Sequence, residues 1–219
     1  MTEIIPAINS ESFREVVEKI QRVEKLTRWI HIDIADGTFT KNALWHNPQE
    51  LAQWTKENPK HSLIEVHLMI ENFEDQIEKW ITAGAKRIIV HIETIKNIKS
   101  FEKIKSLCDT AGVFLMLSVA PETPASVFDQ YIEQNIVCFQ ILAVNPGLPG
   151  QLFLEDSYDK IRYIREKCPY GDIEIDGGIK EGIVKKCKEA GANLFVSASA
   201  IFNAPDIKKA ISDLQSNIE

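Results

Sequence analysis

Hydrophobic runs of strand length alternate with amphipathic segments of helix length from one end of the chain to the other. The runs predict strands at Glu3–Ile8, Trp29–Ile34, Ser62–Leu68, Arg87–Ile92, Val113–Val119, Ile136–Val144, Asp172–Ile175 and Leu194–Ala198. Between them, apolar residues spaced three or four positions apart predict helices, as in Phe73–Ile81 and Ile161–Ile164. Gly84 and Gly191 follow two helical segments, at positions where glycine commonly ends a helix.

This alternation indicates an α/β fold. Strands so rich in apolar residues are typical of a parallel sheet that is buried on both faces. Eight strand–helix units in 219 residues fit a closed (β/α)8 TIM barrel. An open doubly wound sheet is the alternative, but it rarely contains eight regular units. The chain has no linker or low-complexity tract, so we expect residues 1–219 to form one catalytic barrel domain.

Composition and charge exclude several classes of partner. The chain is 44% hydrophobic, its formal net charge is -7 and its pI is near 5.4. This acidic balance argues against binding to nucleic acid or to an anionic membrane. No apolar stretch reaches the length of a membrane span, and the first residues lack the features of a signal peptide. The four cysteines are widely spaced and form no CxxC pair, which indicates reduced thiols in a cytoplasmic protein.

Polar residues with metal-ligand chemistry interrupt three of the predicted strands at or near their carboxyl ends. His31 and Asp33 are two residues apart, so their side chains lie on the same face of a strand. His67 and Asp176 occupy the ends of two other strands. The active site of a (β/α)8 barrel lies at the carboxyl ends of its strands. We therefore predict a site for one divalent metal ion (Zn, Fe(II), Mn or Co) that is bound by His31, Asp33, His67 and Asp176.

The two aspartates predict the chemistry of this site. A carbonyl group bound to the metal is polarised, which acidifies the adjacent carbon. One carboxylate can remove a proton from one face of that carbon while the other returns a proton to the opposite face. Asp33 and Asp176 are therefore the candidate acid/base pair for an inversion at carbon.

Other polar residues near the strand ends have simpler interpretations. A single histidine at such a position is usually a satisfied polar residue at the edge of the core, and only the combination of four groups favours a metal site. Asp36 and Gly37 predict a turn. His91 ends the fourth strand and suits a structural role or a role behind the metal ligands, whereas His46 and His61 carry no functional pattern.

Glycine-rich loops follow the last three strands. Gly147 and Gly150 follow the sixth strand, Gly177 and Gly178 follow the seventh, and Ala198 and Ser199 follow the eighth. In these barrels, backbone N–H groups of such loops bind the phosphate group of the substrate. A tight turn between strand and helix explains each cluster equally well when it is considered alone.

The chain resembles the ribulose-phosphate 3-epimerase family over nearly its whole length. The matching segments, in chain order, are His31–Gly37, Val66–Met69, Val144–Gly147, Ile175–Ile179, Ser199–Phe202 and Ala204–Asp206. The resemblance implies a barrel of the ribulose-phosphate-binding type that interconverts D-ribulose 5-phosphate and D-xylulose 5-phosphate by epimerisation at C3. It places the metal at His31, Asp33, His67 and Asp176, and it implies a homo-oligomer. It also places Ala7 and Met69 beside the substrate.

The chain departs from the pattern of the family at positions around the substrate. Ala7 replaces a serine, Pro149 removes a backbone N–H from a phosphate loop, and Ala198 replaces a glycine. An epimerase of another ketose phosphate and a non-catalytic sugar-phosphate-binding barrel therefore stay open as alternatives. A decarboxylase or aldol-type synthase is disfavoured, because Asp33–Asp36 lacks the lysine that these relatives carry. Trp45 and Trp54 are interpreted as exposed apolar residues that either serve an oligomer interface or simply pack a helix.

Overall fold

The fold is a (β/α)8 barrel, as the hydrophobic pattern predicted. The computed structural model describes residues 2–145 and 151–218 of the chain. Its strands are β1 (Glu3–Ile8), β2 (Trp29–Ala35), β3 (Leu63–Met69), β4 (Arg87–His91), β5 (Phe114–Val119), β6 (Cys138–Leu142), β7 (Asp172–Asp176) and β8 (Leu194–Ser197). They follow one another in sequence order around a closed barrel. The pairing is parallel from β1 to β4, from β5 to β8, and between β8 and β1. The open doubly wound sheet is therefore excluded.

The predicted strands are all present, with small differences at their ends. The largest difference is at β6, which begins at Cys138 rather than Ile136 and ends at Leu142 rather than Val144. Ile136 instead closes the turn that precedes the strand, because its N–H donates to Tyr131 O at 3.1 Å. At the other end, Val144 packs against Gly177. Ile136 is thus an apolar residue that is buried outside the strand, whereas Val144 is half-buried after its end.

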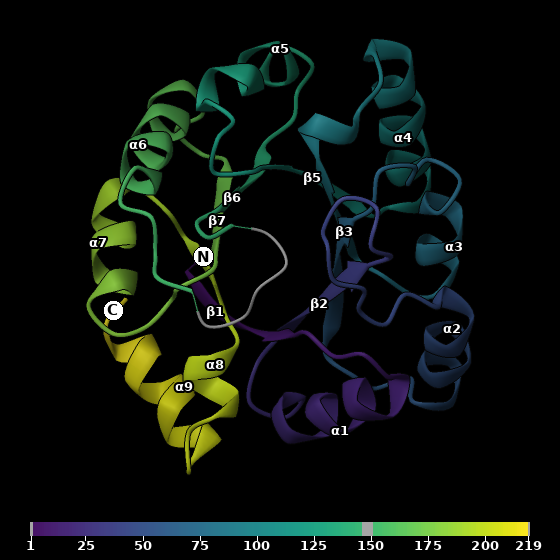
Figure 1. The fold of residues 1–219 in the computed structure, drawn as a ribbon, viewed down its shortest axis with the longest axis vertical. Helices are drawn as coiled ribbons and strands as arrows, with labels where there is room; N and C mark the ends of the chain where they lie inside the picture. The colour runs from purple at the N-terminus through teal and green to yellow at the C-terminus, as the bar shows by residue number, and fades with distance from the viewer. Residues whose placement is uncertain (1, 146–150, 219) are drawn as a thin grey trace. The chain divides into compact units, whose positions relative to one another are not determined.

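Packing divides the chain into two compact parts. One part, which we call the N half, contains residues 7–115; the other, the C half, contains residues 1–6 and 116–219. The helices of the N half are α1 (Phe13–Val23), α2 (Pro48–Glu57), α3 (Ile77–Thr82), the 3-10 helix η1 (Ile92–Thr94) and α4 (Ile98–Ala111). Figure 1 shows α2, α3 and α4 along the outer side of β2 and β3.

Local sequence explains where the helices of the N half begin and which face they bury. Ser12 caps α1, since its side chain accepts a hydrogen bond from the N–H of Glu15. The buried residues of α1 are Val16, Ile20 and Val23, which recur every three or four positions and so share one face. Burial of each such side chain contributes roughly 1.5–3 kcal/mol. The apolar face of this helix therefore fixes it on the strands.

The C half contains η2 (Ala125–Phe128), α5 (Asp129–Ile132), α6 (Ser157–Lys167), α7 (Ile183–Ala190), α8 (Ser199–Phe202) and α9 (Ile207–Ser216). Figure 1 shows α6 and α7 beside β6 and β7. At the amino ends of the strands, Arg165 of α6 donates to the carbonyl oxygens of Gly171 at 2.8 Å and Gly191 at 2.9 Å. This guanidinium group therefore fastens the segment before β7 to the segment before β8.

Two expectations from the sequence were wrong. The helical pattern from Phe73 to Ile81 corresponds to a helix that begins only at Ile77, because Phe73 lies in the preceding turn and is fully buried there. Trp45 and Trp54 are not exposed, with relative exposures of 5% and 9%. The Trp45 ring stacks on Phe13 and meets Trp80 edge to face. The expected exposure was therefore wrong, whereas the alternative that the two tryptophans pack against the fold is confirmed.

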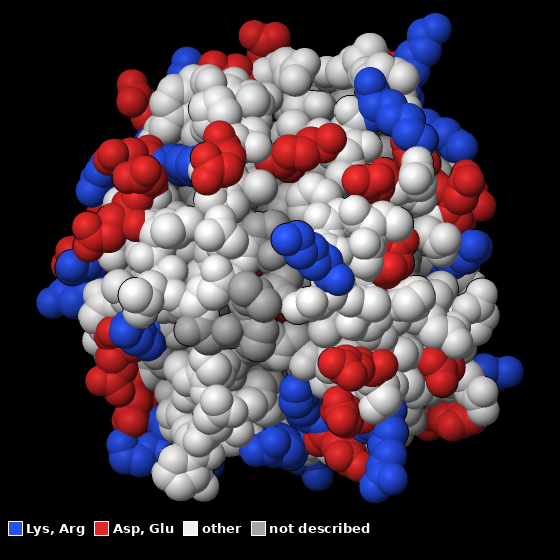
Figure 2. All heavy atoms as spheres, viewed as in Figure 1, with Lys and Arg blue, Asp and Glu red and all other residues white. Residues whose placement is uncertain are grey.

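The surface and the cysteines agree with the composition. Figure 2 shows Lys and Arg intermixed with Asp and Glu on the face that it draws, without one large patch of either sign. Among the described residues, no helix is both long and apolar enough to cross a membrane. All four cysteines are free. Burial raises the pKa of Cys108 and of Cys187 to about 12, so both stay protonated as inert core residues.

Candidate active site

The carboxyl ends of β2 and β3 bring three of the predicted ligands together in the N half. His31 and Asp33 alternate along β2, and Asp33 is paired in register with His67 of β3. Because paired residues of parallel strands lie on the same face, the three side chains meet. The two imidazoles are fully buried, and 13% of the Asp33 side chain is exposed.

One carboxylate oxygen is the common point of this cluster. Asp33 Oδ1 lies 3.1 Å from His31 Nε2 and 3.2 Å from His67 Nδ1. Each of the three residues offers a ligand atom within 4.8 Å of the others. In the metal-free protein, burial raises the pKa of the Asp33 carboxyl. When the ring nitrogens of His31 and His67 that face it are protonated, their hydrogen bonds and charges outweigh burial and hold that pKa well below its usual range. Asp33 is therefore a carboxylate.

The far side of each histidine is also occupied. His31 Nδ1 lies 2.7 Å from Glu65 Oε1, and the other oxygen of Glu65 accepts from Arg87 Nη1. His67 Nε2 lies 2.9 Å from His91 Nε2. In both pairs, the contact behind the histidine leaves the other ring nitrogen directed at Asp33.

These contacts test whether the cluster suits a metal ion. If Nδ1 of His31 donates to Glu65, its neutral ring carries a lone pair on Nε2, and this lone pair faces a carboxylate oxygen. Two acceptors at this distance attract each other only when a proton or a cation lies between them. Two imidazole nitrogens and a carboxylate oxygen are also a ligand set that divalent transition metals accept. The residues fit the predicted metal.

The sequence interpretation missed Glu65 and Arg87. Glu65 lies two residues before His67, and so on the same face of β3, in a run that is otherwise apolar apart from His67. Arg87 opens β4 and pairs in register with Glu65. A charged residue on the inner face of a fully buried strand needs a partner of opposite charge. A search for such a partner on the neighbouring strand could have identified both residues from the sequence.

The fourth predicted ligand, Asp176, belongs to the C half. It is the last residue of β7, is paired with Leu142 of β6, and has a relative exposure of 9%. Its backbone oxygen accepts from Ala143 N at 2.7 Å. Asp176 thus ends its strand at the position where the barrel fold places catalytic groups.

Gly177 and Gly178 are required by the backbone that follows Asp176. Both have positive φ, at +102° and +68°. A Cβ atom at Gly177 would lie 2.5 Å from a methyl group of Val144, and one at Gly178 would lie 2.8 Å from the backbone of Phe153. The turn alone therefore explains both glycines, and any role in phosphate binding is additional.

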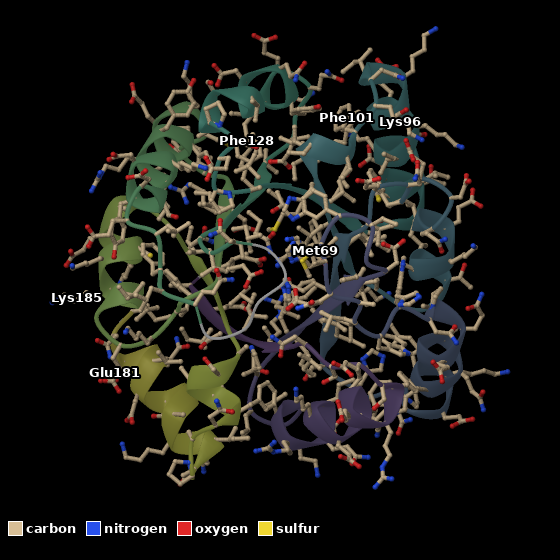
Figure 3. All side chains as sticks on the ribbon, viewed as in Figure 1. Met69, Lys96, Phe101, Phe128, Glu181 and Lys185 are labelled. Carbon is tan, nitrogen blue, oxygen red and sulfur yellow. The ribbon has the colours of Figure 1, made fainter. Side chains whose placement is uncertain are left out.

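The other predicted substrate contacts differ in exposure. Ala7 is buried in β1 and is paired with His31, and Met69 ends β3 with 6% exposure. Figure 3 shows Met69 on the strand side of the N half, whereas Lys96 points outward. Ala198 is half-buried, and Ser199 is exposed at the start of α8. Gly147, Pro149 and Gly150 lie outside the described residues.

The loops after β2 and β3 are tied together by Thr38. Asp36 Oδ1 accepts from Thr38 N at 3.0 Å and from Thr38 Oγ1 at 2.5 Å, which is the turn that the sequence indicated. Thr38 Oγ1 in turn accepts from the N–H of Glu71 at 3.0 Å, and Glu71 follows β3. His46 and His61 contact neighbouring backbone oxygens of Leu44 and Ser62.

Comparison with known proteins decides the family. Residues 3–202 match the profile of the ribulose-phosphate 3 epimerase family. The chain belongs to this family. Among curated family members, it is 32% identical to the cytoplasmic isoform of ribulose-phosphate 3-epimerase from Oryza sativa subsp. japonica, covering 99% of this chain and 94% of that protein. It is 32% identical to ribulose-phosphate 3-epimerase from Bacillus subtilis (strain 168), covering 98% and 99%. The family is one of isomerases.

Solved structures confirm the fold of this family member. A crystal structure of 3-hexulose-6-phosphate synthase aligns with a TM-score of 0.76, covering 100% of both chains at 15% identity. Orotidine 5'-phosphate decarboxylase from Pyrococcus horikoshii OT3 aligns with a TM-score of 0.68, covering 98% of both chains at 18% identity. At these identities, the likeness supports the barrel alone.

Proposed function

We propose that the chain is a metal-dependent ribulose-phosphate 3-epimerase, which interconverts D-ribulose 5-phosphate and D-xylulose 5-phosphate. The observation that carries the proposal is the convergence of His31 Nε2 and His67 Nδ1 on Asp33 Oδ1 in a member of this family. The same activity is named for the rice and Bacillus relatives. A cytoplasmic location is part of the proposal, although an Arabidopsis thaliana relative is named as chloroplastic.

In this proposal, His31, Asp33, His67 and Asp176 bind one divalent metal ion. The first three form the cluster of the N half, and Asp176 is the last residue of β7. The mixed nitrogen and oxygen donors suit zinc, iron(II), manganese or cobalt. We propose that Asp176 completes the site because its strand position and its family motif match those of the other three.

Asp33 and Asp176 are the proposed acid/base pair. One carboxylate accepts the C3 proton from one face of the substrate, and the other donates a proton to the opposite face, which inverts C3. The low pKa of Asp33 keeps it ionised and also makes it a weak base. A divalent metal held by His31, Asp33, His67 and Asp176 would supply the missing acidity, because a cation near a carbonyl group would lower the pKa of the adjacent C–H.

The phosphate and the sugar are proposed to contact the remaining predicted residues. Ser199 and the half-buried turn at Gly177 and Gly178 leave backbone N–H groups near the ends of β7 and β8. Ala7 and Met69 offer apolar contacts at the ends of β1 and β3. Gly147, Gly150 and Ala198 complete the proposed set. A homo-oligomer is also part of the proposal and is checked by light scattering.

Exchange with heavy water tests the proposed reaction. Metal-loaded protein is incubated with D-ribulose 5-phosphate in deuterated water, and the products are resolved by NMR. We expect xylulose 5-phosphate with deuterium at C3. Asp33→Asn and Asp176→Asn should each abolish turnover, whereas Asp36→Asn, which alters a carboxylate of the adjacent turn, should retain it. Substrate binding without exchange in the parent protein would instead identify a non-catalytic sugar-phosphate-binding barrel. Exchange only with a different ketose phosphate would reassign the substrate.

A further inference from the structure

A buried ion pair lies directly behind His31. Glu65 Oε1 is 2.7 Å from His31 Nδ1, and Glu65 Oε2 accepts a hydrogen bond from Arg87 Nη1. The side chains of His31 and Glu65 are fully buried, and that of Arg87 is 5% exposed. The three residues are paired in register across β2, β3 and β4. The strand pairing itself therefore sets the order of imidazole, carboxylate and guanidinium.

Fold stability alone is a poor explanation for this pair. The loss of hydration on burying two charges offsets much of their attraction, and apolar residues of similar size often serve as well. The guanidinium group of Arg87 also lies 4.3 Å from the ring centre of Trp29, which restricts where it can point. Arg87 is thus held in one position, with its charge against Glu65 and its flat face on an aromatic ring.

This arrangement determines which nitrogen of His31 carries the proton. Arg87 cannot lose its proton in a protein, so Glu65 always has a cation beside it and acts toward His31 as an acceptor. The proton of a neutral His31 then lies on Nδ1. The lone pair lies on Nε2, which faces Asp33 Oδ1 at 3.1 Å. A metal ligand must present this lone pair, and a carboxylate on the opposite ring nitrogen is a common way to fix it.

We propose that Glu65, held in place by Arg87, is a positioning residue that keeps the His31 proton on Nδ1 and thereby sets the metal affinity of the site. This inference rests on the proposed function, because the metal site is part of it. Glu65 itself touches neither substrate nor reacting atoms in this proposal. It acts through His31 only.

Two variants and one matched control test the proposal. Glu65→Gln keeps the size of the side chain but replaces one acceptor oxygen by an NH2 donor. Arg87→Lys keeps the charge but loses the planar fork that contacts Glu65 and Trp29. Arg165→Lys is the control, since Arg165 also donates to part-buried acceptors but does so at the amino ends of β7 and β8. Thermal unfolding of each variant reports whether it folds.

The first readout needs no metal. Long-range ¹H–¹⁵N NMR spectra of the imidazole rings, recorded where His31 is neutral, identify the protonated nitrogen. We expect Nδ1–H in the parent protein and in Arg165→Lys, and a mixture of both tautomers in Glu65→Gln. A His31 proton on Nε2 in the parent protein would overturn the proposal without any variant.

The second readout is cobalt(II) binding, measured by competition with a chelator and by the visible absorption of the bound ion. We expect about 10- to 100-fold weaker binding by Glu65→Gln and Arg87→Lys, as is typical when a residue behind a metal ligand is replaced. Arg165→Lys should bind as the parent does. Parent-like affinity and spectrum in whichever of the two variants folds would overturn the proposal.

Failure of the proposed function and failure of the proposed role of Glu65 are distinguishable, since neither the tautomer nor the cobalt(II) measurement involves substrate. A parent protein that has the expected tautomer and binds cobalt(II), but does not epimerise, contradicts the proposed function and supports the role of Glu65. A parent protein that epimerises while Glu65→Gln keeps its cobalt(II) affinity supports the function and contradicts the role of Glu65.

Discussion

The two histidines at the ends of β2 and β3 are held from behind in different ways. His31 contacts a buried carboxylate, Glu65, which is paired with Arg87. His67 contacts a second imidazole, His91, whose Nδ1 lies 3.3 Å from Glu93 Oε2. The side chain of Glu93 is 25% exposed, whereas that of Glu65 is fully buried. His31 is thus held by a buried ion pair, whereas His67 is held by a series of contacts that ends at a partly exposed carboxylate.

The contacts behind the two histidines differ in strength, but both leave one ring nitrogen of the histidine facing Asp33. A single direction of donation satisfies the contacts behind His67: His91 Nδ1–H donates to Glu93, and His67 Nε2–H donates to His91 Nε2. Nδ1 of His67 is then left to face Asp33, as Nε2 of His31 does. A hydrogen bond to a buried carboxylate is roughly twice as strong as one between neutral rings. We therefore expect the His31 side to be the less tolerant of substitution.

The largest loss of activity is expected on replacement of Asp33, which both histidines contact. Asp33→Asn replaces the oxygen shared by the two histidines and removes a proposed acid/base group. We expect kcat/KM for ribulose 5-phosphate to fall by about 10³-fold or more, as for loss of a general acid or base. A coupled assay of xylulose 5-phosphate checks this. Near-parent turnover in Asp33→Asn, measured beside the Asp36→Asn control, would rule out the two-base mechanism.

Replacement of each histidine in turn measures the contacts behind His31 and behind His67 separately. His31→Ala and His67→Ala should both weaken metal binding, which metal analysis after dialysis measures. His31→Ala should also lower the free energy of unfolding of the metal-free protein by about 1.5–3 kcal/mol through loss of a hydrogen bond to a charged group, and His67→Ala by about 1 kcal/mol through loss of a neutral one. Urea denaturation checks the difference. Equal losses in the two variants would contradict the proposed asymmetry.

A smaller contrast is expected between the two glutamates. Glu93→Gln changes a partly exposed group that reaches His67 through His91, and water can replace part of its contact. We expect less than about a 10-fold loss of cobalt(II) affinity, compared with 10- to 100-fold for Glu65→Gln. The same chelator competition measures both. A greater loss in Glu93→Gln than in Glu65→Gln would reverse the comparison.

The smallest effect is expected on the stability of the metal-free protein at acid pH. Burial raises the pKa of Asp33, but the contacts with His31 and His67 lower it further, so its folded value lies below the unfolded one. A depressed pKa stabilises the fold above the unfolded value of about 3.9 and loses this contribution as the pH falls below it. The stability of the metal-free parent should therefore decrease more steeply below about pH 4 than that of Asp33→Asn. Parallel curves in denaturant titrations would contradict this expectation.

The sequence predicted the barrel and the ligand cluster for the same reason. Alternation along a strand places His31 and Asp33 on one face, and strand pairing in chain order then brings His67 beside Asp33. Both facts follow from local periodicity and from the topology of a parallel barrel. Neither requires knowledge of how individual side chains pack.

Features that depend on packing between segments could not be predicted in this way. Glu65 and Arg87 become partners only through the register of β3 with β4, which the sequence pattern leaves open. Trp45 was expected to be exposed, and yet it packs against Phe13 and Trp80, which are distant in sequence. The start of α3 was misplaced because a buried turn residue, Phe73, continues the helical spacing of apolar residues.

The hydroxyl of Thr38 has a consequence for protein engineering. It joins the turn after β2 to the second residue after β3, through Asp36 on one side and Glu71 on the other. A transplant of either loop from a relative would break this link unless the second loop came with it. Recombination libraries built from this family should therefore exchange the two segments as one block.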